Sequence, residues 1–280
     1  ITTAETDTFK AASSTMKFEI QPREVTISDV KVADKTYDGT IDAKITNAGT
    51  LSVNYDGDNL AIVIGKAAYD DKNVGTDKAV SFTGFELSGS AAGNYKLIAQ
   101  PADTTADITA KEITINGATV EGSKVYDGTA EAKITNAGTL SDNYDGENLT
   151  IVAGSAAYDN KNVGTGKTVA FTGFALAGDA AANYKLIAQP TDTTADITVK
   201  EITISGAAVE ASRIYNGTTD AKITNAGTPS VNYDGENLKV AAGKAAYDNK
   251  NVGNGKAVMF TGFALEGDAA ANYKLTAQPD

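Results

Sequence analysis

Residues 124–129 read Lys-Val-Tyr-Asp-Gly-Thr, and closely similar phrases stand at residues 35–40 and 213–218. Their tyrosines, Tyr37, Tyr126 and Tyr215, are 89 residues apart in both steps (126 − 37 and 215 − 126). A unit of this length can bury a core of its own, unlike a solenoid turn, which needs its neighbours. The period therefore predicts a string of similar small domains.

Within one period, apolar and polar residues alternate as they do in β-strands. Val169 and Phe171 share one face of the stretch 167–172, and Asp-Gly or Asn-Gly turn pairs separate such stretches. No helical period appears. The sequence predicts an all-β chain of tandem immunoglobulin-like β-sandwich domains in an elongated rod. In the middle copy, strands are expected near 112–115, 123–126, 130–136, 148–153, 167–172, 174–177, 183–188 and 194–199.

The same alternation assigns an inward-facing set of side chains to the middle copy. Strand residues two positions apart lie on one face of a sheet, so alternate apolar residues mark the buried face. We expect the core to contain Ile113, Ile115, Val125, Tyr126, Ile134, Leu149, Ile151, Val163, Val169, Phe171, Phe174, Leu176, Tyr184, Leu186 and Ile197.

The joints between copies are short. Residues 109–113 read Thr-Ala-Lys-Glu-Ile and residues 198–202 read Thr-Val-Lys-Glu-Ile, with no Gly/Ser-rich spacer. Short joints limit the swing between domains. We divide the chain into an N-terminal strand segment 1–22 and three immunoglobulin-like repeats, 23–110, 111–199 and 200–280, the last lacking its final strand.

The segment 1–22 has two interpretations. Phe18-Glu19-Ile20 stands where Ala106-Asp107-Ile108 stands in the first copy. The segment is either the tail of a preceding repeat, or a donor strand that completes the third repeat of another molecule. In the second case the exchanging residues are Phe9, Ala11, Phe18 and Ile20, and the head-to-tail contact builds filaments.

Several phrases in fixed order resemble those of the YDG-type repeats, which are related to the mostly bacterial immunoglobulin-like repeats of surface and adhesin proteins. The phrases are Lys124–Thr129, Ala157–Gly164, Phe171–Phe174, Ala182–Leu186 and Thr194–Thr198, and the resemblance covers nearly all of 23–280. It implies an exported bacterial protein, at the cell surface or secreted, with a stalk or adhesive role and no catalytic residues. The third copy departs from the pattern at Arg213 and Asn216.

Composition excludes several classes of function. The chain has no histidine, cysteine or tryptophan and a formal net charge of −12. The missing residues remove the commonest general base and metal ligand as well as thiol chemistry. The acidity opposes binding to nucleic acid, and no apolar run is long enough to insert into a membrane. Near-identical copies also argue against one unique active site, so we expect no enzyme.

Two acidic motifs are candidate ligand sites. Asp38, Asp127 and Asn216 follow the motif tyrosine, where a main-chain turn is favoured over a ligand or base role. The loops Asp56–Asn59, Asp145–Asn148 and Asp234–Asn237 are rich in oxygen, which leaves calcium open as a cofactor, although their spacing does not match an EF-hand. We favour the interpretation that these are polar hairpin loops, and we expect no cofactor.

Two further sets of residues recur in every copy. An intramolecular Lys–Asn isopeptide would draw on Lys44, Lys133 and Lys222 with Asn94, Asn183 and Asn272, but these lysines are expected to point outward. Tyr69, Tyr158 and Tyr247 could form a repeated contact surface, although a core position is favoured.

The sequence therefore predicts the structural repeat region of an exported bacterial surface protein, acting as an adhesin stalk or extracellular fibre. A first alternative is a filament subunit that polymerises by donating its N-terminal strand to the third repeat of the next molecule. A second alternative is a module that binds a host glycan or protein. The expected partners are accordingly the chain itself head to tail, neighbouring repeats, or a host molecule.

Overall fold

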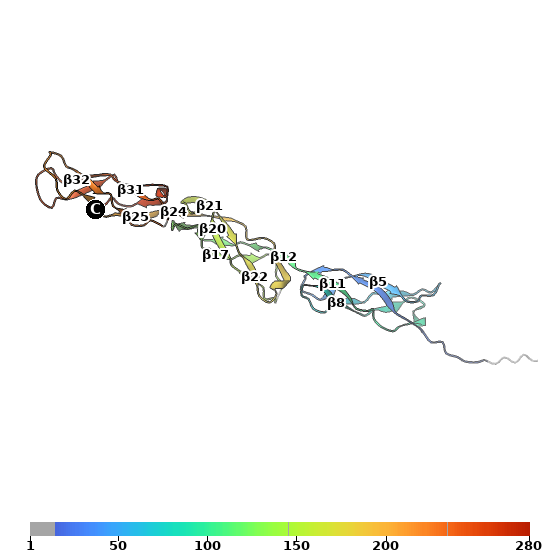
Figure 1. Ribbon diagram of the computed structural model, residues 1–280. Helices are drawn as coiled ribbons and strands as arrows, with labels where there is room; N and C mark the ends of the chain where they lie inside the picture. The colour runs from blue at the N-terminus through green and yellow to red at the C-terminus, as the bar shows by residue number, and fades with distance from the viewer. Residues whose placement is uncertain (1–14, 145, 234) are drawn as a thin grey trace, which may run out of the picture. The chain divides into compact units, whose positions relative to one another are not determined.

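The computed structural model describes residues 15–144, 146–233 and 235–280, which form β-strands and three short 3₁₀ turns (Figure 1). No α-helix occurs in these ranges, so the prediction of an all-β chain is confirmed. The chain divides into two compact units, Ile1–Lys111 and Glu112–Asp280. The second unit contains two of the three repeats.

In the first unit, a five-stranded sheet has the order β3-β11-β8-β7-β4, with β11 antiparallel to β8 and parallel to β3. The pairs β1-β10, β2-β5 and β6-β9 complete the repeat. The elements are β1 Arg23–Val25, β2 Ile27–Val32, β3 Lys35–Thr36, β4 Asp42–Ala43, β5 Ile45–Leu51, β6 Ala61–Val63, β7 Lys66–Tyr69, β8 Gly75–Thr83, β9 Glu86–Ser88, η1 Ala92–Asn94, β10 Tyr95–Leu97 and β11 Thr104–Thr109.

The second repeat has the same five-stranded sheet, in the order β15-β24-β21-β20-β16. The pairs β12-β23, β13-β18, β14-β17 and β19-β22 accompany it. The elements are β12 Lys111–Ile113, β13 Ile115–Asn116, β14 Thr119–Val120, β15 Ser123–Val125, β16 Glu131–Ala132, β17 Ile134–Asn136, β18 Thr139–Leu140, β19 Thr150–Val152, β20 Ser155–Tyr158, β21 Gly164–Thr172, β22 Ala175–Ala177, η2 Ala181–Asn183, β23 Tyr184–Leu186 and β24 Thr193–Thr198.

The third repeat has a smaller main sheet of three strands, β28-β32-β33. Its other pairs, β25-β35, β26-β30, β27-β29 and β31-β34, match those of the second repeat. The elements are β25 Lys200–Ile202, β26 Ile204–Ser205, β27 Ala208–Val209, β28 Asp220–Ala221, β29 Ile223–Asn225, β30 Thr228–Pro229, β31 Lys239–Ala241, β32 Lys244–Tyr247, β33 Val258–Thr261, β34 Ala264–Glu266, η3 Ala270–Asn272 and β35 Tyr273–Leu275.

The main sheet of the third repeat is smaller than that of the second because it has no strand corresponding to β24 among the described residues. In the second repeat, the first half of β21 is held by β24, with Gly164 opposite Ile197 and Lys167 opposite Ala195. The described part of the third repeat contains no strand in the place of β24. Without this partner, β33 covers only Val258–Thr261, whereas β21 covers Gly164–Thr172.

One glycine in each repeat of the second unit allows a close chain crossing. A Cβ atom on Gly154 would lie 1.9 Å from the carbonyl oxygen of Thr172, and one on Gly243 would lie 2.0 Å from that of Thr261. Any side chain would force these two backbone segments apart. Gly154 thus allows the loop before β20 to lie close to the turn after β21. Gly243 does the same for the loop before β32 and the turn after β33.

The core of the second repeat agrees with most of the prediction. Nine predicted residues are buried: Ile113, Ile115, Tyr126, Leu149, Val169, Phe171, Phe174, Tyr184 and Ile197. Ile134, Ile151, Val163, Leu176 and Leu186 are half-buried. Val125 was predicted wrongly, because it is 54% exposed while its neighbour Tyr126 is 1% exposed. Consecutive strand residues point to opposite faces, so only one of the two can face inward.

The strand predictions for the second repeat were incomplete. Three observed strands, β14, β18 and β20, were not expected. β14 and β18 are two residues long, too short to show a period of two. β20 reads Ser-Ala-Ala-Tyr, and its alanines gave no apolar signal, although Ala156 is buried.

Candidate functional site

The joint between the second and third repeats contains a buried carboxylate. Glu236 lies in the loop before β31, and its side chain is only 2% exposed. Its Oε1 accepts a hydrogen bond from Lys161 Nζ at 2.8 Å and a second from the hydroxyl of Tyr126, both in the second repeat. Its Oε2 accepts the hydroxyl of Tyr273, in its own repeat, at 2.5 Å. The carboxylate thus joins two repeats through three donors.

An aromatic cluster surrounds this carboxylate. The ring of Tyr126 lies edge-on to Tyr273, with centroids 5.4 Å apart, and edge-on to Tyr233, at 5.8 Å. Edge-to-face packing of this kind adds about 1 kcal/mol per pair beyond the burial of area. Residues of both repeats share one hydrophobic cluster, to which the third repeat contributes Ile202, Leu238, Ala269 and Tyr273. The two repeats therefore share part of a core.

A second polar contact lies beside the cluster. Asn272, which is 4% exposed, accepts a hydrogen bond through Oδ1 from the main-chain N–H of Val163 at 2.9 Å. Its Nδ2 donates to Asn162 Oδ1 at 3.1 Å. These contacts fix the Lys-Asn-Val segment 161–163 against η3 and β35 of the next repeat.

The glycine of the YDG phrase also lies in the joint. Gly128 has a φ of +80° and lies against Tyr233, since a Cβ atom there would come within 2.9 Å of the ring carbon Cγ. The corresponding Gly217 of the third repeat has no atom within 4 Å of the same position. In the second repeat, the Tyr-Asp-Gly phrase therefore forms a turn and also contacts the third repeat.

Burial and hydrogen bonding shift the pKa values of Glu236 and of the two tyrosines bound to it. Burial opposes ionisation of Glu236, but the hydrogen bonds from Lys161, Tyr126 and Tyr273 outweigh it and lower the pKa of this carboxyl. Burial, with the carboxylate alongside, raises the pKa of the Tyr126 and Tyr273 hydroxyls. The cluster therefore holds a carboxylate and two neutral phenols at neutral pH.

The lysine that begins the repeated phrase, Lys124 in the second repeat, makes its contacts within its own repeat. Lys124 Nζ donates to Asp127 Oδ1 at 2.8 Å, to the carbonyl of Thr129 at 2.9 Å and to that of Glu131 at 2.8 Å. The ammonium also lies 5.6 Å from the ring centre of Tyr158. Lys35 makes the same contacts with Asp38, Thr40 and Asp42 in the first repeat. In the third repeat Arg213 donates to the carbonyls of Thr218 and Asp220.

The comparisons with known proteins agree with this repeated arrangement. The model of the YDG domain matches residues 21–106, 109–195 and 198–280. The chain belongs to the YDG domain family. No curated protein and no solved structure matches the chain. Residues of the Tyr-Asp-Gly phrase thus take part in the lysine contacts, in the glycine turn and in the joint.

The turn interpretation of the phrase is confirmed in all three YDG repeats. Asp38 and Asp127 each accept, through Oδ1, the main-chain N–H two residues on, at 2.9 Å. Asn216 does the same for Thr218 at 3.1 Å. Burial opposes ionisation of Asp127, but hydrogen bonds from Lys124 and Thr129 outweigh it and lower the pKa of its carboxyl. Asn216 keeps the turn without the charge.

Acidic loop residues bind tyrosine hydroxyls of their own repeats. Asp58 Oδ2 accepts the hydroxyl of Tyr95 at 2.5 Å, as Glu236 accepts that of Tyr273. The described residues include no group of three or more acidic side chains that could hold a metal ion. Asp145 and Asp234, which belonged to the calcium candidates, lie outside the described residues. No local pattern predicts the burial of Glu236, because its partners Tyr273, Lys161 and Tyr126 lie 37, 75 and 110 positions away in the sequence.

The repeated lysines lie at the surface, and two of the three repeated tyrosines are buried. Lys133 and Lys222 are exposed and form ion pairs with Glu121 and Glu210, while Asn272 lies in the joint, bonded to Val163 and Asn162. Tyr69 and Tyr158 are 2% and 5% exposed, so they belong to the core rather than to a contact surface. Of the predicted strand-exchange residues, Phe18 and Ile20 are exposed, and Phe9 and Ala11 lie outside the described residues.

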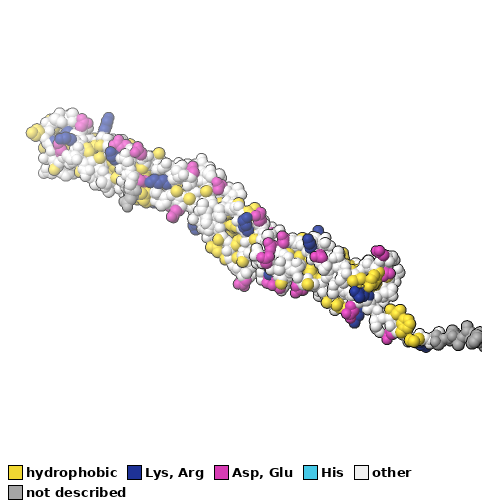
Figure 2. All heavy atoms as spheres, turned by 45° about the vertical axis from the view of Figure 1, so that its right-hand side comes forward, with side chains coloured by type: hydrophobic (Ala, Val, Ile, Leu, Met, Phe, Trp, Pro, Cys, Tyr) yellow, Lys and Arg dark blue, Asp and Glu magenta, His cyan; other side chains and the backbone are white. Residues whose placement is uncertain are grey.

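The surface shows no segregation of charge on the face in view, where acidic and basic side chains are interspersed (Figure 2). Within the described residues, no helix is long and apolar enough to cross a membrane.

Proposed function

We propose that the chain is a structural repeat region whose joints hold consecutive YDG repeats in a fixed relation. The buried contact of Glu236 with Lys161, Tyr126 and Tyr273 is the observation that carries this proposal. A single residue, Val199, separates β24 of the second repeat from β25 of the third. A joint with a shared core and no spacer resists bending, which is what a stalk or fibre requires.

We further propose that each repeat is an immunoglobulin-like β-sandwich and that the repeats form a stiff, elongated array. In support, each of the first two repeats pairs an early strand in parallel with its last strand, β3 with β11 and β15 with β24, beside an otherwise antiparallel sheet. The proposed setting is the surface or surroundings of a bacterial cell, in an adhesin stalk or extracellular fibre. Labelling of intact producing cells with an antibody to the repeats tests this setting, and signal only after lysis would contradict it.

Spin labels test the fixed joint directly, because the chain contains no cysteine. Cysteines at Thr135 and Thr224, exposed equivalent positions in the second and third repeats, would carry the labels. We expect a narrow distribution of distances between the labels in the parent chain. Glu236→Ala should broaden it, because the two tyrosine hydroxyls and Lys161 lose their common acceptor.

The matched control is Glu201→Ala, which removes an exposed ion pair with Lys274 in the same repeat and should leave the distribution narrow. A broad distribution in the parent chain would overturn the proposal. No contact in the described residues favours recognition of a host glycan or protein, so this alternative gains no support from the geometry.

A further inference from the structure

The inward-facing row of side chains on β21 begins with a lysine. Lys167 precedes Val169 and Phe171, which are 0% and 3% exposed, at intervals of two residues, so the three side chains lie on the same face of the strand. The side chain of Lys167 is itself only 9% exposed. A lysine is rarely this buried unless its charge has partners, because withdrawing an ammonium group from water is costly.

The loop between β20 and β21, residues 159–163, supplies these partners, and we refer to it as the joint loop. Lys167 Nζ lies 2.8 Å from Asp159 Oδ1 and donates a hydrogen bond to Asn160 Oδ1 at 2.8 Å. The stem of the lysine lies along Gly164, where a Cβ atom would be 3.3 Å from Lys167 Cγ and Cδ. One long side chain thus links the first two residues of the joint loop to β21.

The joint loop also makes contacts with the third repeat. Asn160 Oδ1 accepts the main-chain N–H of Asn162 at 3.0 Å as well as the ammonium of Lys167. Asn162 Oδ1 in turn accepts Asn272 Nδ2 at 3.1 Å, and the N–H of Val163 donates to Asn272 Oδ1 at 2.9 Å. A path of hydrogen bonds through Asn160 and Asn162 therefore leads from Lys167 to the third repeat.

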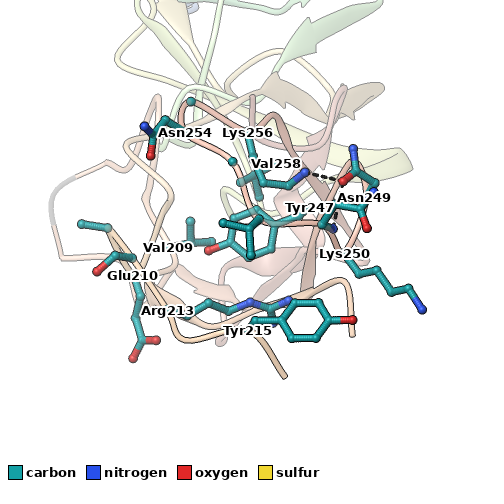
Figure 3. Close-up of a pocket in the computed structure, with 16 residues that line it drawn as sticks. Val209, Glu210, Arg213, Tyr215, Tyr247, Asn249, Lys250, Asn254, Lys256 and Val258 are labelled. Atoms are coloured by element: carbon teal, nitrogen blue, oxygen red, sulfur yellow. Dashed lines mark hydrogen bonds between the residues drawn. The ribbon is translucent and has the colours of Figure 1, made fainter. Parts of the chain in front are cut away.

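All three repeats contain this lysine arrangement. In the first repeat, Lys78 pairs with Asp70 at 3.1 Å and with Asp71 at 2.9 Å. In the third repeat, Lys256 donates to Asn249 Oδ1 at 2.7 Å, and Figure 3 shows its ammonium pointing at this amide. Every donor and acceptor belongs to the same repeat as its partner, so these bonds form without a neighbouring repeat.

A loop that is already held in shape favours contact with a neighbour. The joint loop carries Lys161, whose ammonium lies 2.8 Å from Oε1 of the buried Glu236. Ordering a free loop on contact costs conformational entropy, and a loop fixed beforehand avoids this cost. Accurate placement of contacting side chains depends on hydrogen bonds that support them from behind.

We propose that Lys167 is a positioning residue of the joint, which holds the joint loop in the conformation that receives Glu236 and Asn272 of the third repeat. The inference rests on the proposed function, in which this joint keeps the two repeats in a fixed relation. The partners of Lys167 are Asp159 and Asn160, so it acts on the third repeat through the joint loop. The surface that fits this loop is accordingly a following repeat with an acidic side chain and an asparagine at these two places.

The spin-labelled chain, with cysteines at Thr135 and Thr224, measures this role. We expect Lys167→Met to broaden the distribution of distances between the labels. The matched variant is Lys256→Met, which removes the same kind of bonds within the third repeat and leaves the joint loop intact, so the distribution should stay narrow. A narrow distribution in Lys167→Met, or equal broadening in both variants, would overturn the proposal.

A second pair of variants changes the acceptor and keeps the lysine. Asn160→Ala removes the oxygen shared by Lys167 and Asn162, and it should broaden the distribution. Asn160→Asp should leave the distribution narrow, because Asp71 stands at this place in the first repeat and pairs with Lys78. Equal distributions in the alanine and aspartate variants would contradict the proposal, even where Lys167→Met fails to fold.

Amide hydrogen exchange separates a displaced joint loop from a repeat that unfolds as a whole. In Lys167→Met we expect the N–H of Val163 to exchange at least about fivefold faster relative to that of Ile187, which donates to the carbonyl of Ile113 within the second repeat. Equal acceleration of both amides would rule out a positioning role. A broad distance distribution in the parent chain would contradict the proposed function, and the exchange comparison would still test whether Lys167 holds the loop.

Discussion

Lys161 and Glu236 belong to different repeats, and their charged groups lie 2.8 Å apart in the joint between the second and third repeats. The carboxylate is buried while the lysine side chain is 40% exposed, so the pair is only partly withdrawn from water. Two tyrosine hydroxyls complete the set of donors to the carboxylate. Because the buried charge has several partners, loss of any one of them is costly, and the geometry of the joint is tightly specified.

The joint should respond to acid. Since the folded-state pKa of Glu236 lies below its ordinary value of 4.5, its stabilising contribution is fully present above that value and is lost as pH falls through the lower folded-state pKa. At pH 7 we expect Glu236→Gln to reduce the free energy of unfolding of the second unit by about 2 kcal/mol. The difference between parent and variant should shrink below about pH 4.5. Denaturant unfolding at a series of pH values measures it.

Glu201→Gln provides the control for this series. Glu201 and Lys274 form an exposed pair at 3.0 Å, so the substitution should change the unfolding free energy by less than about 0.5 kcal/mol. A difference between parent and Glu236→Gln that stays constant from pH 7 to pH 3 would contradict the assignment of a charged carboxylate to the joint.

Gly154→Ala should destabilise the second repeat strongly. The new methyl group would lie 1.9 Å from the carbonyl oxygen of Thr172, so backbone must move, at a cost of about 2 kcal/mol or more. Gly122→Ala is the matched variant, because a Cβ atom there meets nothing within 4 Å, and its effect should stay within about 0.5 kcal/mol. Thermal unfolding of the two variants compares them, and equal melting temperatures would refute the close crossing.

The lysine of the YDG phrase should tolerate arginine better than methionine. Lys124→Met removes the donor for the carbonyls of Thr129 and Glu131 and should cost about 2 kcal/mol. Lys124→Arg should cost less than half of this, because Arg213 donates to the equivalent carbonyls in the third repeat. Lys133→Met, which removes an exposed side chain, serves as the control. Chemical denaturation gives the order, and an arginine variant as unstable as the methionine variant would contradict the proposed role.

The repeat period and the all-β class could be read from sequence because both are local patterns. The alternation of Val169 and Phe171 reports a buried strand face whatever lies opposite it. The Asp-Gly turn was also predictable, since Asp127 bonds its own main chain two residues on. Val125 was misplaced because hydrophobicity alone did not show that the adjacent Tyr126 takes the inward position.

An all-β chain of three similar repeats with Asp-Gly or Asn-Gly turns can be recognised without a structure, because strand alternation and turn chemistry act over a few neighbouring residues and the period shows when the copies are compared. The contacts that the repeated phrase makes beyond its turn are visible only in the folded chain. Glu236 and Tyr126 are 110 residues apart and meet only when the ends of two repeats come together. Such a contact depends on the folded surfaces of both repeats, and no local pattern in either one reports it.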